Sequence, residues 1–172
     1  MDVHYTENLA VTACVEFGSW IDRDPTAIYV SAIDCFGDYV PGRFFEREMP
    51  CLLDALNRIR KTFDILVIDG FVHLKPPVIK GLGYHLAEAM PYPVAVIGVA
   101  KNPLKLADQY VEVLRGRSRK PLFLSSIHIP VHRAADLLKG MFGAYRIPRL
   151  IKIADQVARA GVNRGTQRGI TG

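Results

Sequence analysis

Tyr39-Val-Pro-Gly-Arg-Phe-Phe-Glu-Arg-Glu-Met-Pro-Cys-Leu-Leu53 joins a stiff aromatic turn to the start of a helix, and both halves carry residues suited to a site. Pro41 fixes its own φ angle, and Gly42 permits backbone angles that other residues resist. Tyr39 is therefore predicted to lie on a rigid loop.

Apolar residues then recur at intervals of three and four from Phe45 to Ile59, which predicts an amphipathic helix with one buried face. Pro50 is expected in its first turn, because a proline deeper in a helix removes a backbone hydrogen bond. Glu48 lies on or beside the apolar face. A buried carboxylate is costly unless a cation pairs with it, so Glu48 is a candidate ligand for a cation or a metal.

The composition is that of a single folded domain. The 172 residues are 49% hydrophobic and 23% charged, which is enough for one core and too few for two ordinary domains. Lysine and arginine number 22 against 17 acids, a balance that fits a polyanionic partner without requiring one. No apolar stretch is long enough to cross a bilayer and the start is polar, so a cytoplasmic protein without a membrane segment is expected.

Alternating and β-branched segments predict three antiparallel strands before the helix, at residues 3–5, 9–17 and 27–33. Residues 64–70 are apolar between two acids, as in a buried parallel strand, and ligands gather at the carboxyl ends of such strands. Asp69 is thus predicted at the mouth of a site. Farther along, the pattern predicts helices at residues 82–90, 104–114, 131–142 and 148–160, and strands at 92–100 and 121–125.

This order of elements predicts an α/β fold of the ribonuclease H-like type, by analogy at the level of the fold. Three antiparallel strands and then parallel strands would form a mixed central sheet flanked by helices. Residues 1–160 are expected to form one domain. Residues 161–172 are rich in glycine and carry two arginines, and we expect a disordered basic tail there.

Three acids could meet in such a fold: Asp2 in the first strand, Glu48 on the helix and Asp69 after the fourth strand. Nucleases commonly gather three or four carboxylates around one or two Mg²⁺ ions that activate water. The trio therefore predicts a metal site for phosphodiester hydrolysis. The competing interpretations are that Asp69 caps a turn, that Glu48 pairs with an arginine on a solvated helix face, and that Asp2 frays with the terminus.

The ordered motifs of this chain make it resemble the endonuclease V family. The stretches that carry the resemblance are Asp2-Val-His-Tyr5, Tyr39-Val-Pro-Gly42, Arg47-Glu48-Met-Pro50, Val67-Ile-Asp69-Gly70 and Ile97-Gly-Val-Ala-Lys101. Weaker matches follow at Pro121-Leu-Phe-Leu-Ser125 and Tyr145-Arg-Ile-Pro148. Each piece alone is short, but the set in this order and spacing is specific.

The resemblance implies a Mg²⁺-dependent endonuclease, with Mn²⁺ as an alternative ion, that recognises inosine in DNA or RNA and cuts on its 3′ side. It implies that Asp2, Glu48 and Asp69 hold the metal, and His128 is our placement for the active-site histidine, with His132 as its rival. The resemblance also implies contacts with the substrate. Tyr39 matches the wedge beside an expelled base, the pocket of that base is matched by Gly42, Phe44 and Gly70, and Lys101 matches a contact with phosphate. Pro41 is likewise predicted to bind substrate.

Three features depart from the family pattern. Only Met1 precedes Asp2, residues 71–76 replace a glycine and a His-Pro pair, and the stretch between Lys101 and Pro121 is short. Two other functions therefore stay open: a non-catalytic nucleic-acid-binding homologue, and a nuclease of the same fold with another substrate. A monomer is expected, and no motif decides between DNA and RNA.

Overall fold

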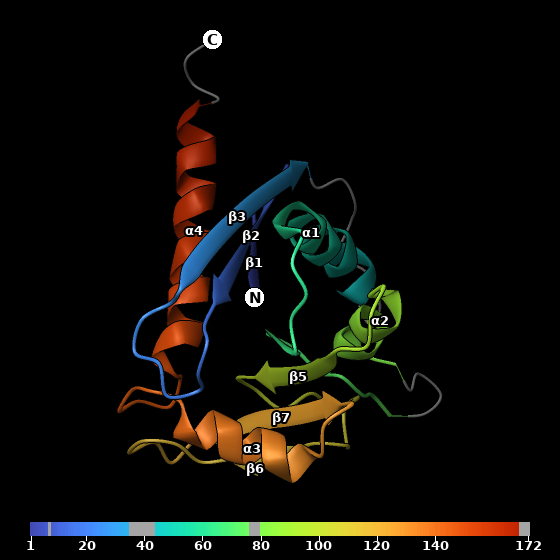
Figure 1. Cartoon of the computed structure of the whole chain (residues 1–172), viewed down its shortest axis with the longest axis vertical. Coiled ribbons are helices and arrows are strands. Elements are labelled where there is room, and N and C mark those ends of the chain that lie inside the picture. Colours follow the sequence, from blue (N-terminus) through green and yellow to red (C-terminus); the bar gives the residue numbers. More distant parts are fainter. Residues whose placement is uncertain (7, 35–43, 76–79, 169–172) are drawn as a thin grey trace.

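The computed structural model describes residues 1–6, 8–34, 44–75 and 80–168, with the side chains of Phe44 and of residues 162–168 left aside (Figure 1). The first sheet is antiparallel, in the order β1-β2-β3. Its central strand is buried from Ala10 to Cys14, because elements cover both of its faces. The strands are β1 (Asp2–Tyr5), β2 (Leu9–Glu16) and β3 (Ala27–Asp34).

The second sheet has the order β4-β5-β7-β6. Strands β4 and β5 are parallel, whereas β7 runs antiparallel to both of its neighbours. The two sheets meet at the start of the chain, where the amino group of Met1 donates a hydrogen bond of 2.7 Å to the carbonyl of Val67. The strands are β4 (Ile65–Ile68), β5 (Ala95–Ala100), β6 (Val111–Val113) and β7 (Leu122–Ile127).

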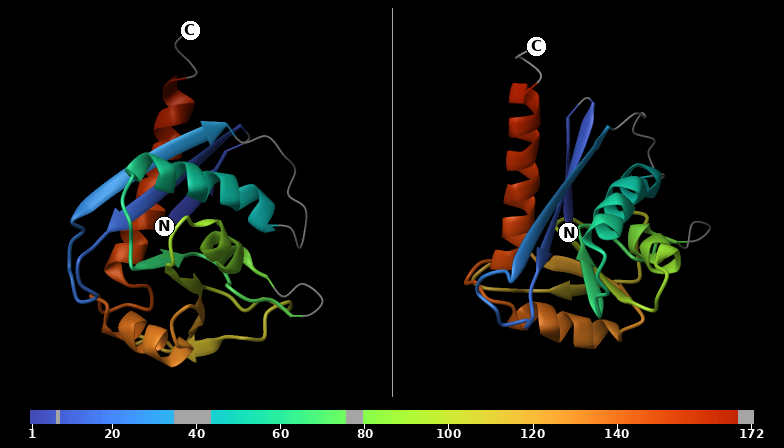
Figure 2. Two further views of the ribbon diagram at one scale, coloured as in Figure 1. Left: turned by 45° about the vertical axis from the view of Figure 1, so that its right-hand side comes forward. Right: turned by 45° about the horizontal axis from the view of Figure 1, so that its top comes forward.

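Four helices flank these sheets: α1 (Phe44–Ile59), α2 (Leu82–Ala89), α3 (Val131–Gly140) and α4 (Arg149–Arg168). Helix α4 lies along one side of the β1–β3 sheet and α1 along the other (Figure 2). Helix α2 packs on β5, and α3 packs on β6 and β7. No helix in the described part of the chain is long and apolar enough to span a membrane.

Two apolar clusters hold this arrangement together. One joins α1 and α2 to β4 and β5 through residues such as Leu52, Ile68 and Leu86. The other joins α3 and the start of α4 to the far side of the second sheet, through Leu124 and Leu138 among others. The result is the predicted α/β, ribonuclease H-like architecture with a mixed set of antiparallel and parallel strands.

Residues 104–114 do not form the predicted helix. They form turns followed by the short edge strand β6, and Leu104 and Leu106 face solvent, so their spacing did not mark a buried face. A parallel strand needs a long crossover, usually a helix, to bring the chain back to the starting edge. Without that helix, the chain returns through β6 and β7 runs antiparallel to β5, where the sequence predicted a parallel strand.

One position inside a helix and one helix end also differ from the prediction. Pro50 lies inside α1, in its second turn rather than its first. Helix α4 continues past Ala160 to Arg168, so residues 161–168 of the predicted tail are helical, and residues 169–172 lie outside the described part. Gly161 explains the close packing there, because a Cβ atom at this position would lie 2.7 Å from Cγ1 of Val11.

Candidate active site

Asp2, Glu48 and Asp69 come together around one cavity. Asp2 begins β1, Glu48 lies in the second turn of α1, and Asp69 directly follows β4. With Tyr5 and Gly70, among others, they line a cavity of about 330 Å³. The trio meets because the start of β1 is bonded to β4 and helix α1 contacts all three strands of the first sheet. All three acids therefore line the same cavity, and their role as metal ligands stays a prediction.

The electrostatics of this cavity favour a bound cation. Glu48 is only 8% exposed. Burial, followed by repulsion from Asp69 and Asp2, raises the pKa of Glu48 to about 8. Burial, followed by repulsion from Asp69, also raises the pKa of Asp2. Among the described residues, no donor forms a hydrogen bond with the Glu48 carboxyl group.

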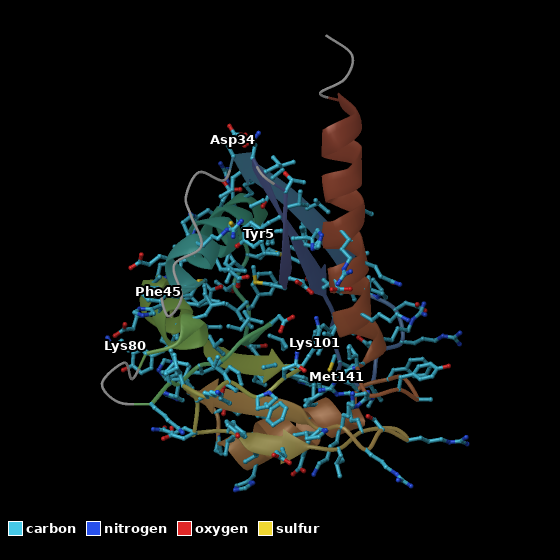
Figure 3. All side chains as sticks on the ribbon, turned by 180° about the vertical axis from the view of Figure 1, so that it is seen from behind. Tyr5, Asp34, Phe45, Lys80, Lys101 and Met141 are labelled. Atoms are coloured by element: carbon cyan, nitrogen blue, oxygen red, sulfur yellow. The ribbon has the colours of Figure 1, made fainter. Side chains whose placement is uncertain are left out.

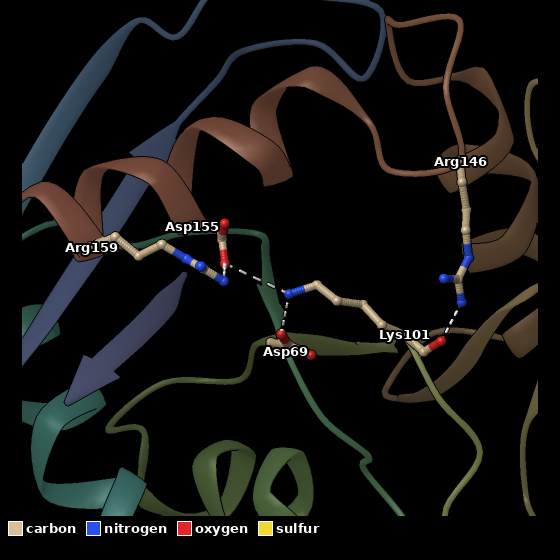
Figure 4. A network of polar contacts seen from close by, with 5 residues as sticks. All are labelled: Asp69, Lys101, Arg146, Asp155 and Arg159. Carbon is tan, nitrogen blue, oxygen red and sulfur yellow. Dashed lines mark hydrogen bonds and ion pairs between the residues drawn. The ribbon is translucent and has the colours of Figure 1, made fainter.

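Lys101 places a positive charge against Asp69 (Figure 4). Its Nζ atom lies 2.8 Å from Oδ2 of Asp69 and 3.8 Å from Oδ1 of Asp155. Burial acts to lower the pKa of Lys101, but the hydrogen bond to Asp69 and the surrounding carboxylates outweigh it and raise the pKa. Lys101 lies at the carboxyl end of β5, beside the carboxyl end of β4, as expected for parallel neighbours.

Asp155 is a fourth acid at this site, and sequence reasoning missed it. It lies on α4, where Nη2 of Arg159 bonds to its Oδ1 atom at 3.1 Å, one turn farther along the helix. Its charge contributes to the raised pKa of Asp2. One feature of the sequence could have identified it: Asp155 is an acid among basic residues on this helix, and it follows Ala154, which is buried.

Oxygen donors of this kind suit a hard divalent ion such as Mg²⁺. In the part of the chain that the structure describes, no three His, Cys, Asp or Glu side chains already converge as a ligand set for one ion. Instead, the Lys101 ammonium lies against Asp69. The acids fit a metal by their chemistry and by the cavity that they share.

The backbone around Asp69 is held by a glycine pair. Gly70 has a φ angle of 147°, and its carbonyl lies so close to Gly98 of β5 that a Cβ atom at Gly98 would collide with it. This contact lets the two strand ends approach at the site. The position of Asp69 therefore depends on a glycine in the neighbouring strand.

Gly98→Ala should accordingly destabilise the protein, because the new methyl group meets backbone that cannot move aside cheaply. We expect a loss of about 1–3 kcal/mol and a fall of roughly 5 °C in the thermal midpoint, measured by circular dichroism. Gly140→Ala is the matched control, since nothing lies within 4 Å of its added Cβ atom. Equal midpoints for the two variants would show that the Gly98 contact is not tight.

The structure does not bring His128 or His132 to the acids. Nδ1 of His128 lies 2.8 Å from the carbonyl of Val94, which precedes β5, whereas Lys101 follows that strand. The two ends of β5 are about 20 Å apart at 3.3 Å per residue. His132 is exposed on the first turn of α3. The antiparallel course of β7 is the cause, because it carries His128 to the opposite end of the sheet.

The other predicted contact residues are only partly described. Gly70 lines the cavity with the acids, and Phe44 is the first residue of α1. Tyr39, Pro41 and Gly42 lie outside the described residues.

Comparisons with known proteins show which family this chain resembles. The family model for endonuclease V matches residues 1–118, which include Asp2, Glu48, Asp69 and Lys101. Endonuclease V of Nostoc punctiforme is 35% identical over 144 residues, covering 71% of this chain and 63% of the relative. The Nocardia farcinica enzyme is 34% identical over 149 residues, covering 74% and 64%. The chain thus spans slightly less than two thirds of these relatives.

Solved structures show the same fold. Endonuclease V from Bacillus subtilis superposes with a TM-score of 0.78 at 19% identity, covering 97% of this chain and 81% of the other. Ciona intestinalis endonuclease V, in complex with a 24mer DNA containing an inosine followed by a ribo-adenosine, gives 0.76 at 19% identity, with coverages of 95% and 84%. Because the family model spans well over half of the sequence and relatives above 30% identity align with more than two thirds of it, this chain belongs to the endonuclease V family.

Proposed function

We propose that this protein is a metal-dependent endonuclease that recognises inosine in DNA or RNA and hydrolyses a phosphodiester bond on its 3′ side. The observation that carries the proposal is the convergence of Asp2, Glu48 and Asp69 on one cavity, with Lys101 beside them. Family membership supports it, as does the inosine-containing DNA bound to the similarly folded Ciona protein.

Mg²⁺ is the ion we propose for the site, with Mn²⁺ as an alternative. Asp2, Glu48 and Asp69 would hold it, and Asp155 is close enough to share Lys101 with Asp69. An ion held there would supply an activated water and would offset negative charge on the scissile phosphate. Glu48 is buried on α1, so its carboxyl group would remain in the cavity and be available as a ligand.

Lys101 would position the scissile phosphate. Its ammonium donates a hydrogen bond to Asp69, and its flexible stem would let it pair with a phosphate oxygen beside the acids. Tyr39, Pro41, Gly42, Phe44 and Gly70 would contact the inosine, which must leave the base stack before its edge can be read. Nothing in these roles depends on His128 or His132.

Cleavage of matched oligomers tests this function. We expect Mg²⁺-dependent cutting of DNA or RNA strands that carry one inosine, and no cutting of the same strands with adenine, in a denaturing-gel assay. Adding excess chelator should stop the reaction. Equal cutting of the plain and inosine strands would contradict lesion recognition, and binding without any cutting would favour the non-catalytic homologue.

A further inference from the structure

The positive charge of this protein is concentrated in one part of the chain. Residues 114–154 contain nine lysines and arginines and one acid, whereas the whole chain has a net charge of only +5. Without that segment the remaining residues have an excess of acids. Two loops of this segment lie side by side, residues 114–121 between β6 and β7 and residues 141–148 between α3 and α4. We call these two loops the rim.

Arg115 clamps the two loops of the rim together. It is only 6% exposed, and its guanidinium donates to the carbonyls of Tyr145 at 2.7 Å and Gly143 at 3.1 Å, and also to that of Met141. Gly116 has a φ angle of +58°, and a Cβ atom there would collide with the carbonyl of Ala144. The loops are thus in direct backbone contact, and the rim is a rigid feature.

The rim presents an aromatic ring among unneutralised cations. Tyr145 is 78% exposed, although the backbone that carries it is held by Arg115. Arg117, Arg119 and Lys120 are exposed, and no acid among the described residues pairs with any of them. Exposed aromatic rings beside arginines are typical of surfaces that stack unpaired bases and follow a sugar-phosphate backbone.

The rim is also tied to the candidate active site. The Arg146 guanidinium donates to the carbonyl of Lys101, as Figure 4 shows, and to that of Pro121 at 2.6 Å. Lys101 and Met141, which is the first residue of the second rim loop, line one pocket and are both labelled in Figure 3. Strand β7 starts here because its first residues pair with the carboxyl end of β5.

We propose that the rim binds the single nucleic-acid strand that flanks the scissile bond, with Tyr145 stacking on an unpaired base and Arg117 and Arg119 contacting phosphates. This inference rests on the proposed function and adds a strand-binding surface to it. The surface lies on the Lys101 side of the acids, because Arg146 of the rim bonds to the carbonyl of Lys101. The exposure of Tyr145 makes the ring free to stack without any rearrangement of the fold.

Binding of the full chain to a fluorescent single-stranded oligomer with one inosine, measured by anisotropy in chelator, tests the role of Tyr145. Tyr145→Ala should weaken binding by about tenfold, as expected for the loss of one base stack, whereas Tyr145→Phe should bind like the wild type. Both variants should keep the wild-type thermal midpoint, because the ring is exposed. Wild-type affinity in Tyr145→Ala would overturn the stacking.

Salt dependence tests the arginines. The double variant Arg117→Ala/Arg119→Ala should reduce the slope of log Kd against log salt by about 1.4, the value for two phosphates of a single strand. Arg133→Ala/Lys139→Ala removes the same charge from α3 and should leave the slope unchanged. Equal reductions in both double variants would show a general effect of net charge and would contradict the rim.

Two further measurements separate this inference from the proposed function. Wild-type cleavage of the inosine strand in Mg²⁺ tests the active site alone, so intact cleavage with normal binding by all rim variants would overturn only the rim. Loss of binding in Tyr145→Ala without any wild-type cleavage would support the rim and overturn the nuclease. If polyglutamate competes as well as an oligomer of equal charge, the rim is not a nucleic-acid surface.

Discussion

Asp69→Asn is expected to lower the rate of cleavage of an inosine-containing strand by about 1,000-fold or more. Asparagine keeps the shape of the side chain and can still accept the hydrogen bond from Lys101, but it removes the charge that would hold a divalent ion. The loss of several kcal/mol of electrostatic stabilisation corresponds to three or more powers of ten in rate. Single-turnover cleavage with saturating enzyme measures it.

Asp69→Asn should still bind the inosine strand, since we propose that Asp69 holds the metal and does not contact the base. Asp64→Asn is the matched control, because Asp64 is an exposed acid at the opposite end of the same strand. It should cleave at the wild-type rate. Retained activity in Asp69→Asn would contradict the proposal that this acid holds the metal.

Glu48→Gln is expected to stabilise the metal-free protein while removing its response to metal. The neutral amide avoids both the burial of a charge and the repulsion from Asp69 and Asp2, which are the causes of the raised Glu48 pKa. A gain of about 1–2 kcal/mol would raise the thermal midpoint by roughly 2–8 °C at this chain length. Functional sites commonly trade stability for activity in this way.

Mg²⁺ should change the difference in thermal midpoint between the wild type and Glu48→Gln. At about 100 times its Kd, an ion that binds only the folded state stabilises it by about 2.7 kcal/mol, so the wild-type midpoint should rise in Mg²⁺. The midpoint of Glu48→Gln should scarcely move. Thermal scans of both proteins with chelator and with Mg²⁺ measure all four values, and an equal shift in the two proteins would place the ion away from Glu48.

The acids at the centre of the site could be predicted from sequence because their positions follow from strong local patterns. Asp69 ends a continuous apolar run, and Glu48 lies beside an apolar helical stripe, so each acid had a definite place before any contact was known. The predicted fold added Asp2 to them, and the family resemblance then implied that all three hold a metal. Their convergence is what the structure adds, together with Asp155, whose helix reaches the site from a distant part of the chain.

The prediction that His128 lies near the acids depended on the same assumption as the wrong helix at residues 104–114, namely a parallel β7. Apolar residues recur there at intervals of three and four, as in an amphipathic helix, at Leu104, Ala107, Val111 and Leu114. Leu104 and Leu114 are nevertheless exposed. The predicted helix would have returned the chain for a parallel β7. The actual return through β6 reverses β7 and moves His128 to the far end of β5. Strand direction depends on contacts between distant segments, which local periodicity does not encode.

The most direct test of the central claim is the position of the cut. Wild-type protein in Mg²⁺ is incubated with a 5′-labelled strand that carries one inosine, and the product is sized against a ladder of the same sequence. The account predicts one product that retains the inosine and ends on its 3′ side. A product that ends before the inosine, or cuts scattered without regard to it, would contradict the account.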